Sequence, residues 1–109
     1  HDPEILQSAM TTLLNSREWE RLEEDFINMD HIFIVGNGGN MSIADHAAVD
    51  ISRLTDKNAI CPGSAIVATS IISDYSFEIW FTKWIQQRLR YLDASRVLVL
   101  GMSCSVSAL

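Results

Sequence analysis

The sequence predicts an α/β fold built on a parallel sheet, and three observations carry this prediction. Two short runs, 32–35 and 96–100, are almost wholly apolar, as strands buried on both faces of a parallel sheet are. Segments with apolar residues at helical spacing lie between these runs. A glycine-rich turn follows the first run and opens a helix, which is the order of a strand–helix–strand unit.

The chain opens with a helical segment over residues 1–30. Asp2 and Pro3 are typical of a helix start, because Asp caps the first turn and proline suits its first position. Apolar residues then recur every three to four positions, with a break near Asn15 and Ser16, which predicts one amphipathic helix or a pair. The segment holds eight acids and two bases, so its net charge of −6 equals that of the whole chain. Without a basic face, the chain is not expected to bind nucleic acid.

From residue 31 onward, predicted strands alternate with predicted helices, so we expect a three-layer arrangement around the sheet. The expected elements are a strand over 32–35, a helix over 41–54, a loop over 56–63, a second strand over 65–68, a helix over 77–92 and a third strand over 96–100. The spacing places Ile43, Ala47 and Ile51 on the inner face of the first of these helices. Trp80 and Trp84 are expected in the core.

Composition excludes several classes of protein. The chain has 109 residues, of which 48% are hydrophobic and 20% charged, as in a globular domain rather than a disordered segment. No apolar run approaches the roughly 20 residues of a membrane span, and no signal segment opens the chain. Cys61 and Cys104 do not form a disulfide framework, so a reducing cytoplasm is the expected compartment, with no membrane partner.

The turn at 36–40 reads Gly-Asn-Gly-Gly-Asn and is the first candidate site. Glycines let a backbone approach a ligand closely, and the amides that start a helix attract an anion such as phosphate. A tight turn that binds nothing is the alternative. A dinucleotide site is a further alternative, although Met41 occupies the position of its third glycine and no acid follows the predicted second strand at Thr69.

Two further groups of residues are candidates for binding or catalysis. Ser103, Cys104 and Ser105 follow the third strand, and their small hydroxyls and thiol can surround a phosphate at the same sheet edge as the glycine turn. A loop of ordinary turn-forming residues is the alternative. His46 and Asp50 are four positions apart, so they share one face of a helix and can bind a metal or exchange protons. Their alternative is a solvated helix surface.

Three segments in this order resemble a known family. They are residues 34–50, with the glycine turn followed by His46 and Asp50; 73–77, reading Ser-Asp-Tyr-Ser-Phe; and 100–105, reading Leu-Gly-Met-Ser-Cys-Ser. Together they resemble the signature of SIS (sugar isomerase) domains, and more narrowly of the phosphoheptose isomerases. The resemblance covers about residues 31–107, and the leading helix fits the N-terminal region of that family.

The resemblance implies an aldose–ketose isomerisation of a sugar phosphate through an enediol, as between sedoheptulose 7-phosphate and a heptose 7-phosphate. The residues it implicates are Gly38, Gly39, Asn40, Ser103, Cys104 and Ser105 around the phosphate, Asn37 and Asp74 on sugar hydroxyls, His46 as a zinc ligand, and Asp50 as zinc ligand and general base. The carboxylate would move a proton between adjacent carbons, and the metal could polarise the carbonyl.

The resemblance also implies how the chain is organised. Residues 1–30 would be a helical oligomerisation segment, giving a homodimer or homotetramer, and 31–109 the first part of an SIS domain with about three strands. The C-terminal part of the domain would be absent, together with the remaining zinc ligands and a Gln and a His of the family. The 109-residue polypeptide is therefore not expected to catalyse alone.

Four departures from the family pattern support a second hypothesis. Asn40 replaces a serine, Asp50 a glutamate, Cys104 a threonine and Val106 a glycine. A carboxylate one methylene shorter can misplace a base by about 1 Å, which can cost on the order of a hundredfold in rate. The alternative is a non-catalytic SIS module that binds a sugar phosphate as an effector or serves as a tetrameric adaptor.

Overall fold

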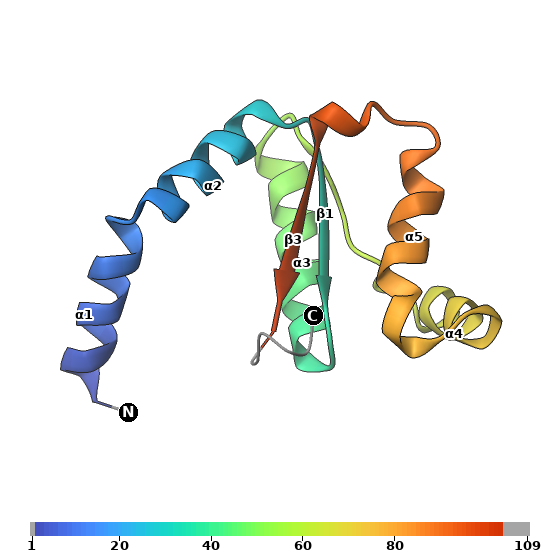
Figure 1. Cartoon of the computed structure of the whole chain (residues 1–109), viewed down its shortest axis with the longest axis horizontal. Helices are drawn as coiled ribbons and strands as arrows, with labels where there is room; N and C mark the ends of the chain where they lie inside the picture. Colours follow the sequence, from blue (N-terminus) through green and yellow to red (C-terminus); the bar gives the residue numbers. More distant parts are fainter. Residues whose placement is uncertain (1, 104–109) are drawn as a thin grey trace.

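The computed structural model of the chain describes residues 2–103, which form a three-stranded parallel sheet with helices around it (Figure 1). The elements are α1 (Pro3–Leu14), α2 (Arg17–Asn28), β1 (His31–Gly36), α3 (Gly39–Leu54), β2 (Asn58–Ile60), α4 (Ala65–Asp74), the 3-10 turn η1 (Phe77–Ile79), α5 (Trp80–Leu89), the 3-10 turn η2 (Ala94–Arg96) and β3 (Val97–Met102). The strand order is β2-β1-β3 with all pairs parallel, so the predicted α/β class is confirmed.

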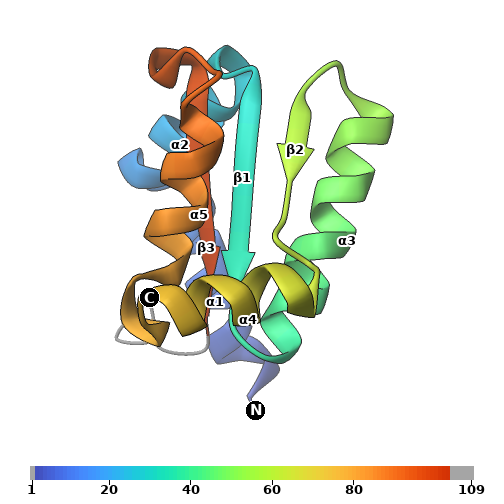
Figure 2. The same cartoon turned by 90° about the vertical axis from the view of Figure 1, so that its right-hand side faces the viewer.

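The central strand β1 is buried on both faces, and its alternating side chains build two cores. Ile32 and Ile34 pack with Ala44, Ala48 and Ala59, which places α3 on one face of the sheet. Phe33 and Val35 pack on the other face, against side chains of α4 and α5. Figure 2 shows α3 and α5 on opposite sides of the strands. The expected three-layer arrangement is therefore present.

Two tryptophans close the core on the α5 side. Trp80 and Trp84 are 4% and 2% exposed, which confirms their predicted place in the core. The Trp84 ring meets Phe33 edge-on, with 5.3 Å between ring centroids and 63° between planes. Aromatic pairs favour this geometry because the positive edge of one ring faces the negative face of the other.

The predicted second strand is wrong. Residues 65–68 begin helix α4, and the Ser64 side chain caps it by accepting a hydrogen bond from the Ile66 amide at 3.2 Å. Val67, Ala68 and Ile71 then face the core at helical spacing, which a short apolar run cannot reveal by itself. The second strand is β2, inside the segment predicted as a loop, where only Ala59 is buried between two more exposed neighbours.

The helix that follows the glycine turn is rotated from its predicted orientation. Ala44 and Ala48 face the sheet, whereas Ile43 is 58% exposed and was predicted to be buried. Ala47 and Ile51 lie at the margin of the same core, as expected. The small alanines let α3 approach β1 closely, so that packing distance rather than side-chain size decides which face is buried.

The leading segment is a pair of helices, which is one of the two arrangements that the sequence predicted. The Asp2 carboxylate caps α1 by accepting from the Glu4 amide at 2.9 Å. The Ser16 hydroxyl caps α2 by accepting from the Trp19 amide at 3.1 Å, which fixes the break between the two helices. Neither helix contains a buried residue. Figure 1 shows α1 reaching away from the sheet.

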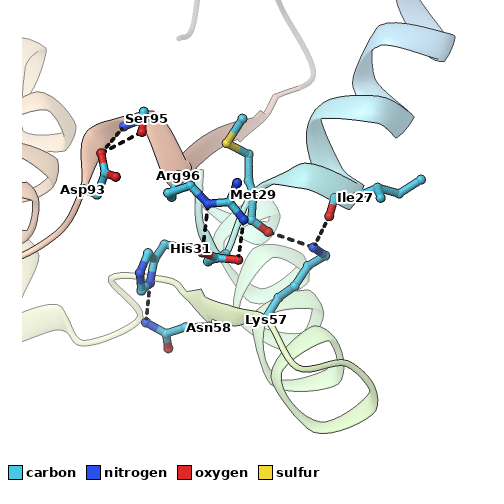
Figure 3. A network of polar contacts seen from close by, with 9 residues as sticks. Ile27, Met29, His31, Lys57, Asn58, Asp93, Ser95 and Arg96 are labelled. Atoms are coloured by element: carbon cyan, nitrogen blue, oxygen red, sulfur yellow. Dashed lines mark hydrogen bonds and ion pairs between the residues drawn. The ribbon is translucent and has the colours of Figure 1, made fainter.

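A polar network ties α2 to the amino ends of the strands (Figure 3). Lys57 Nζ donates to the carbonyl oxygens of Ile27 and Met29 at 2.9 and 2.8 Å. It thereby brings a positive charge to the C-terminal end of α2, which has no base of its own in its last turn. Arg96 donates to both carboxylate oxygens of Asp30 at 2.9 and 3.0 Å, and this hydrogen-bonded guanidinium lowers the pKa of Asp30.

Among residues 2–103, no helix is both long enough and apolar enough to cross a bilayer.

Candidate functional site

The glycine turn joins the carboxyl end of β1 to the start of α3. Gly36 must be glycine, because a Cβ there would lie 2.7 Å from the Asn40 carbonyl oxygen. Gly38 has φ +57° and is the N-terminal cap residue of α3, with no side-chain cap hydrogen bond. At Gly38 and Gly39 a Cβ would meet no heavy atom within 4 Å. The turn is therefore closed on its inner side and open around the residues that start the helix.

Two of the amides that begin α3 are engaged within the turn. The Asn40 amide donates to the Asn37 carbonyl at 3.1 Å, and the Met41 amide donates to the Gly38 carbonyl at 3.0 Å. These bonds hold the turn in one shape. The positive end of the α3 dipole remains directed at the open side of the turn, where an anion is favoured.

The second predicted phosphate loop starts at the same edge of the sheet. In the register between β1 and β3, Gly36 is opposite Met102, so Asn37 and Ser103 each follow directly after a paired position. The structure thus brings the glycine turn and Ser103 to adjacent strand ends, as the parallel arrangement predicts. Cys104 and Ser105 lie outside the described residues.

Asp74 comes from a different layer of the fold. It is the exposed last residue of α4, and α4 lies at the level of the carboxyl ends of β1 and β3, on the side that carries α5 (Figures 1 and 2). Asp74 therefore lies beside the sheet edge at which the glycine turn begins. The sequence indicated a role for Asp74 only through the resemblance. Its place at the end of a helix was not predicted, because residues 65–68, which begin α4, were predicted to be a strand.

His46 and Asp50 form a hydrogen-bonded pair on α3. Their spacing of four puts Nδ1 of His46 2.9 Å from Oδ2 of Asp50. Nδ1–H of the imidazole donates this hydrogen bond to the carboxylate, so the other ring nitrogen, Nε2, is not used by the pair. The side chains are 79% and 44% exposed, so both can reach a ligand.

The pair lies in a shallow, open groove of about 450 Å³ along the outer face of α3. Its lining is formed by Ser42, Asp45, His46, Val49, Asp50 and Arg53. All of these residues come from one helix, so the groove has a single wall. A ligand held there by residues 2–103 would remain exposed on its other side.

The residues predicted to bind zinc do not make a zinc site by themselves. Structural and catalytic zinc ions take at least three protein ligands. Within the described part of the chain, no group of three or more His, Cys, Asp or Glu side chains is placed to hold a metal ion. His46 and Asp50 offer two ligands, and zinc stays a prediction from the resemblance.

One feature of the sheet edge was not predicted. Cys61 follows β2, and its Sγ lies 3.3 Å from Met41 Sδ at the first turn of α3. Burial, with the nearby Asp45 carboxylate, raises the pKa of the Cys61 thiol to about 11, so it is protonated at neutral pH and a poor nucleophile. A Cβ at Gly63 would lie 3.1 Å from Oδ1 of Asp45, so a larger residue at this position would press on the Asp45 carboxylate.

The corrected second strand also bears on the dinucleotide alternative. A dinucleotide fold places an acid after its second strand to hold a ribose. Here β2 ends at Ile60 and is followed by Cys61, Pro62 and Gly63. The acid is missing at the observed strand end, as it is at Thr69, and Met41 still stands where the fingerprint has its third glycine.

Comparison of the chain with protein-family models, with curated proteins and with solved structures found no match.

Proposed function

We propose that this chain is the first part of an SIS-type domain of a phosphosugar isomerase, acting on a heptose phosphate or a related sugar. The observation that carries the proposal is the register that sets Gly36 opposite Met102. Two loops with the residue types of a phosphate site thereby begin at neighbouring strand ends, where sheets of this class bind ligands.

In this proposal each group has a separate task. The glycine turn and the loop that starts at Ser103 receive the phosphate, and Asn37 and Asp74 meet sugar hydroxyls. His46 lies seven residues after Gly39, about 10 Å along the helix axis at 1.5 Å per residue. That separation is comparable to the length of an extended seven-carbon sugar phosphate, so a phosphate at the turn is compatible with reacting carbons near the pair.

The pair supplies the proton transfer that an aldose–ketose isomerisation requires. A base removes the proton from the hydroxyl-bearing carbon next to the carbonyl while the carbonyl oxygen takes up a proton, which gives the enediol. The proton is then delivered to the former carbonyl carbon while the other hydroxyl loses its proton and becomes the new carbonyl. Nε2 of His46 and the second oxygen of Asp50 are the available acceptors, and their mutual hydrogen bond orients both.

A non-catalytic SIS module that binds a sugar phosphate as an effector, or acts as a tetrameric adaptor, is the second candidate. It is favoured by the one-sided groove and by the exposed His46–Asp50 pair. In its effector-binding form, such a module needs the phosphate loops and no proton transfer. Binding and turnover therefore distinguish the two candidates.

The first prediction is selective binding of a phosphorylated sugar. Calorimetry with sedoheptulose 7-phosphate should show saturable binding, whereas sedoheptulose should bind at least tenfold more weakly, because the turn and helix dipole act on the phosphate.

In the intact gene product, Asp50→Asn should lower isomerase turnover on the order of a hundredfold or more while leaving sugar-phosphate affinity unchanged.

The controls separate binding from chemistry. Asp56→Asn removes an exposed carboxylate of the loop after α3, outside the proposed site, and should change neither affinity nor turnover. Binding without turnover in the intact, folded protein would favour the effector-binding module. Absence of any binding of the phosphorylated sugar would exclude the isomerase and the effector-binding module, and only the tetrameric adaptor would then stand.

We further propose that α1 associates with a second copy of this chain. Its apolar stripe is largely exposed, with Ile5 at 68%, Leu6 at 60% and Leu14 at 49%. Glu4 is the one charged residue of α1, so little repulsion opposes pairing of two such helices. A 12-residue helix with this stripe in water is marginal alone, and a partner helix would stabilise it.

The oligomer prediction concerns Leu13 and Leu14, which are 45% and 49% exposed. Replacing both with Asp should weaken association about a hundredfold or more, since burying two leucines contributes at least 3 kcal/mol and each 1.4 kcal/mol is tenfold. Sedimentation velocity over a concentration series measures this change. Ser8→Asp with Thr11→Asp adds the same charge on the opposite side of α1 and should leave association intact; a monomeric parent protein would refute the proposal.

A further inference from the structure

At the β2 edge of the sheet, one residue directs its backbone N–H and C=O away from the neighbouring strand β1. In parallel pairing, alternate residues of a strand exchange hydrogen bonds with the neighbouring strand. The Asn58 amide donates to the Asp30 carbonyl at 2.8 Å, so Asn58 and Ile60 are the residues of β2 that address β1. Ala59 lies between them, and its backbone N–H and C=O therefore point to the open side of the strand.

Both of these outward groups are engaged by a single hydroxyl. Ser52 Oγ accepts a hydrogen bond from the Ala59 amide at 3.0 Å and donates one to the Ala59 carbonyl oxygen at 3.0 Å. Ser52 belongs to the last turn of α3, seven positions before Ala59. Its side chain thus occupies the donor and the acceptor that an added strand would use.

We infer that Ser52 closes the β2 edge of the sheet against the addition of another strand. An unpaired edge is a ready template for pairing with a second chain, and proteins block such edges with short strands and polar side chains. Because β2 is only three residues long and presents one outward residue, one hydroxyl is sufficient. Closure of this edge limits which surfaces of the chain can assemble, and it does not depend on the proposed sugar-phosphate site.

A closed β2 edge also restricts how copies of the chain associate. An added strand would have to displace Ser52 and pair with Ala59 alone, gaining two hydrogen bonds while losing two. Each exchange of this kind contributes little net free energy. Association of copies is therefore directed away from β2, which is consistent with an interface built on α1.

Backbone amide exchange in the full chain tests the inference. In the parent protein the Ala59 amide should exchange slowly although it lies at a sheet edge. Ser52→Ala should speed exchange at Ala59 at least tenfold, while the amides of Asn58 and Ile60, which face β1, keep their protection. Ser52→Thr retains the hydroxyl and should restore slow exchange. Ser70→Ala, which removes an exposed serine of α4 whose hydroxyl donates to the Val67 carbonyl within the same helix, is the matched control.

Sedimentation of the same variants tests the consequence for assembly. Ser52→Ala should show additional concentration-dependent association that Ser52→Thr and Ser70→Ala lack. Unchanged exchange at Ala59, or no added association, would overturn the inference. Equal loss of protection at all three β2 amides would also overturn it, because Ser52 would then hold β2 on the sheet rather than close its edge.

Discussion

Replacing Phe33 with alanine is expected to lower the free energy of unfolding by about 3–5 kcal/mol, the usual cost of removing a buried phenyl ring. Phe33 is fully buried in the central strand and packs between Trp84 and the side chains of α4. The loss has two parts, because the ring's burial is lost and its edge-on contact with Trp84 disappears. Urea unfolding followed by tryptophan fluorescence measures the change.

Phe77→Ala is the matched control for this prediction. Phe77 is also an aromatic residue on the α5 side of the sheet, but it is 60% exposed in the η1 turn. Its replacement should change the unfolding free energy by no more than about 0.5 kcal/mol. Similar losses in the two variants would mean that the core does not have the described arrangement.

The fold class was predictable because β1 dominates it. An uninterrupted apolar run with a glycine turn behind it specifies a strand buried on both faces, and helical spacing around Trp80 and Trp84 specifies the layer that covers one of them. Both features are local in sequence. The start of the leading segment at Asp2 was predictable for the same reason, since this cap acts on an amide two residues away. The choice between one helix and two was left open, and the Ser16 cap decides it.

The second strand was not predictable by the same reasoning. Residues 65–68 are apolar and include Ile66 and Val67, yet their environment is set by the Ser64 cap and by packing of α4 on the sheet. Conversely, β2 has little strand character of its own and forms because Asn58 pairs with the backbone of β1. An edge strand of three residues depends on its neighbour more than on its own sequence.

Parts of the candidate site were also predictable from local sequence, and one part was not. The His46–Asp50 pair follows from spacing on one helix, and the adjacent loops follow from two parallel strands. The single wall of the α3 groove could not be predicted, because it depends on which face of α3 meets the sheet. That face is chosen by Ala44 and Ala48, small residues that carry little signal in a hydrophobic pattern.

Replacing Gly36 with alanine is the second substitution expected to destabilise the fold strongly, because Gly36 touches the first turn of α3. The new Cβ would lie 2.7 Å from the carbonyl oxygen and 2.8 Å from the carbonyl carbon of Asn40, both backbone atoms. Relief requires a shift of the first turn of α3, so we expect a loss of about 2–3 kcal/mol in unfolding free energy. Weaker sugar-phosphate binding should accompany it, since the turn moves with the helix.

Gly39→Ala tests whether this loss comes from the clash. At Gly39 a Cβ meets no atom within 4 Å, and the residue is the first of α3 and does not have a positive φ. Alanine there should be neutral or add up to about 1 kcal/mol, because it favours a helix over the flexible unfolded chain. Opposite signs for the two substitutions in urea unfolding would establish Gly36 as the point where strand and helix touch. Equal effects would contradict the described turn, since both variants differ from the parent by the same single methyl group.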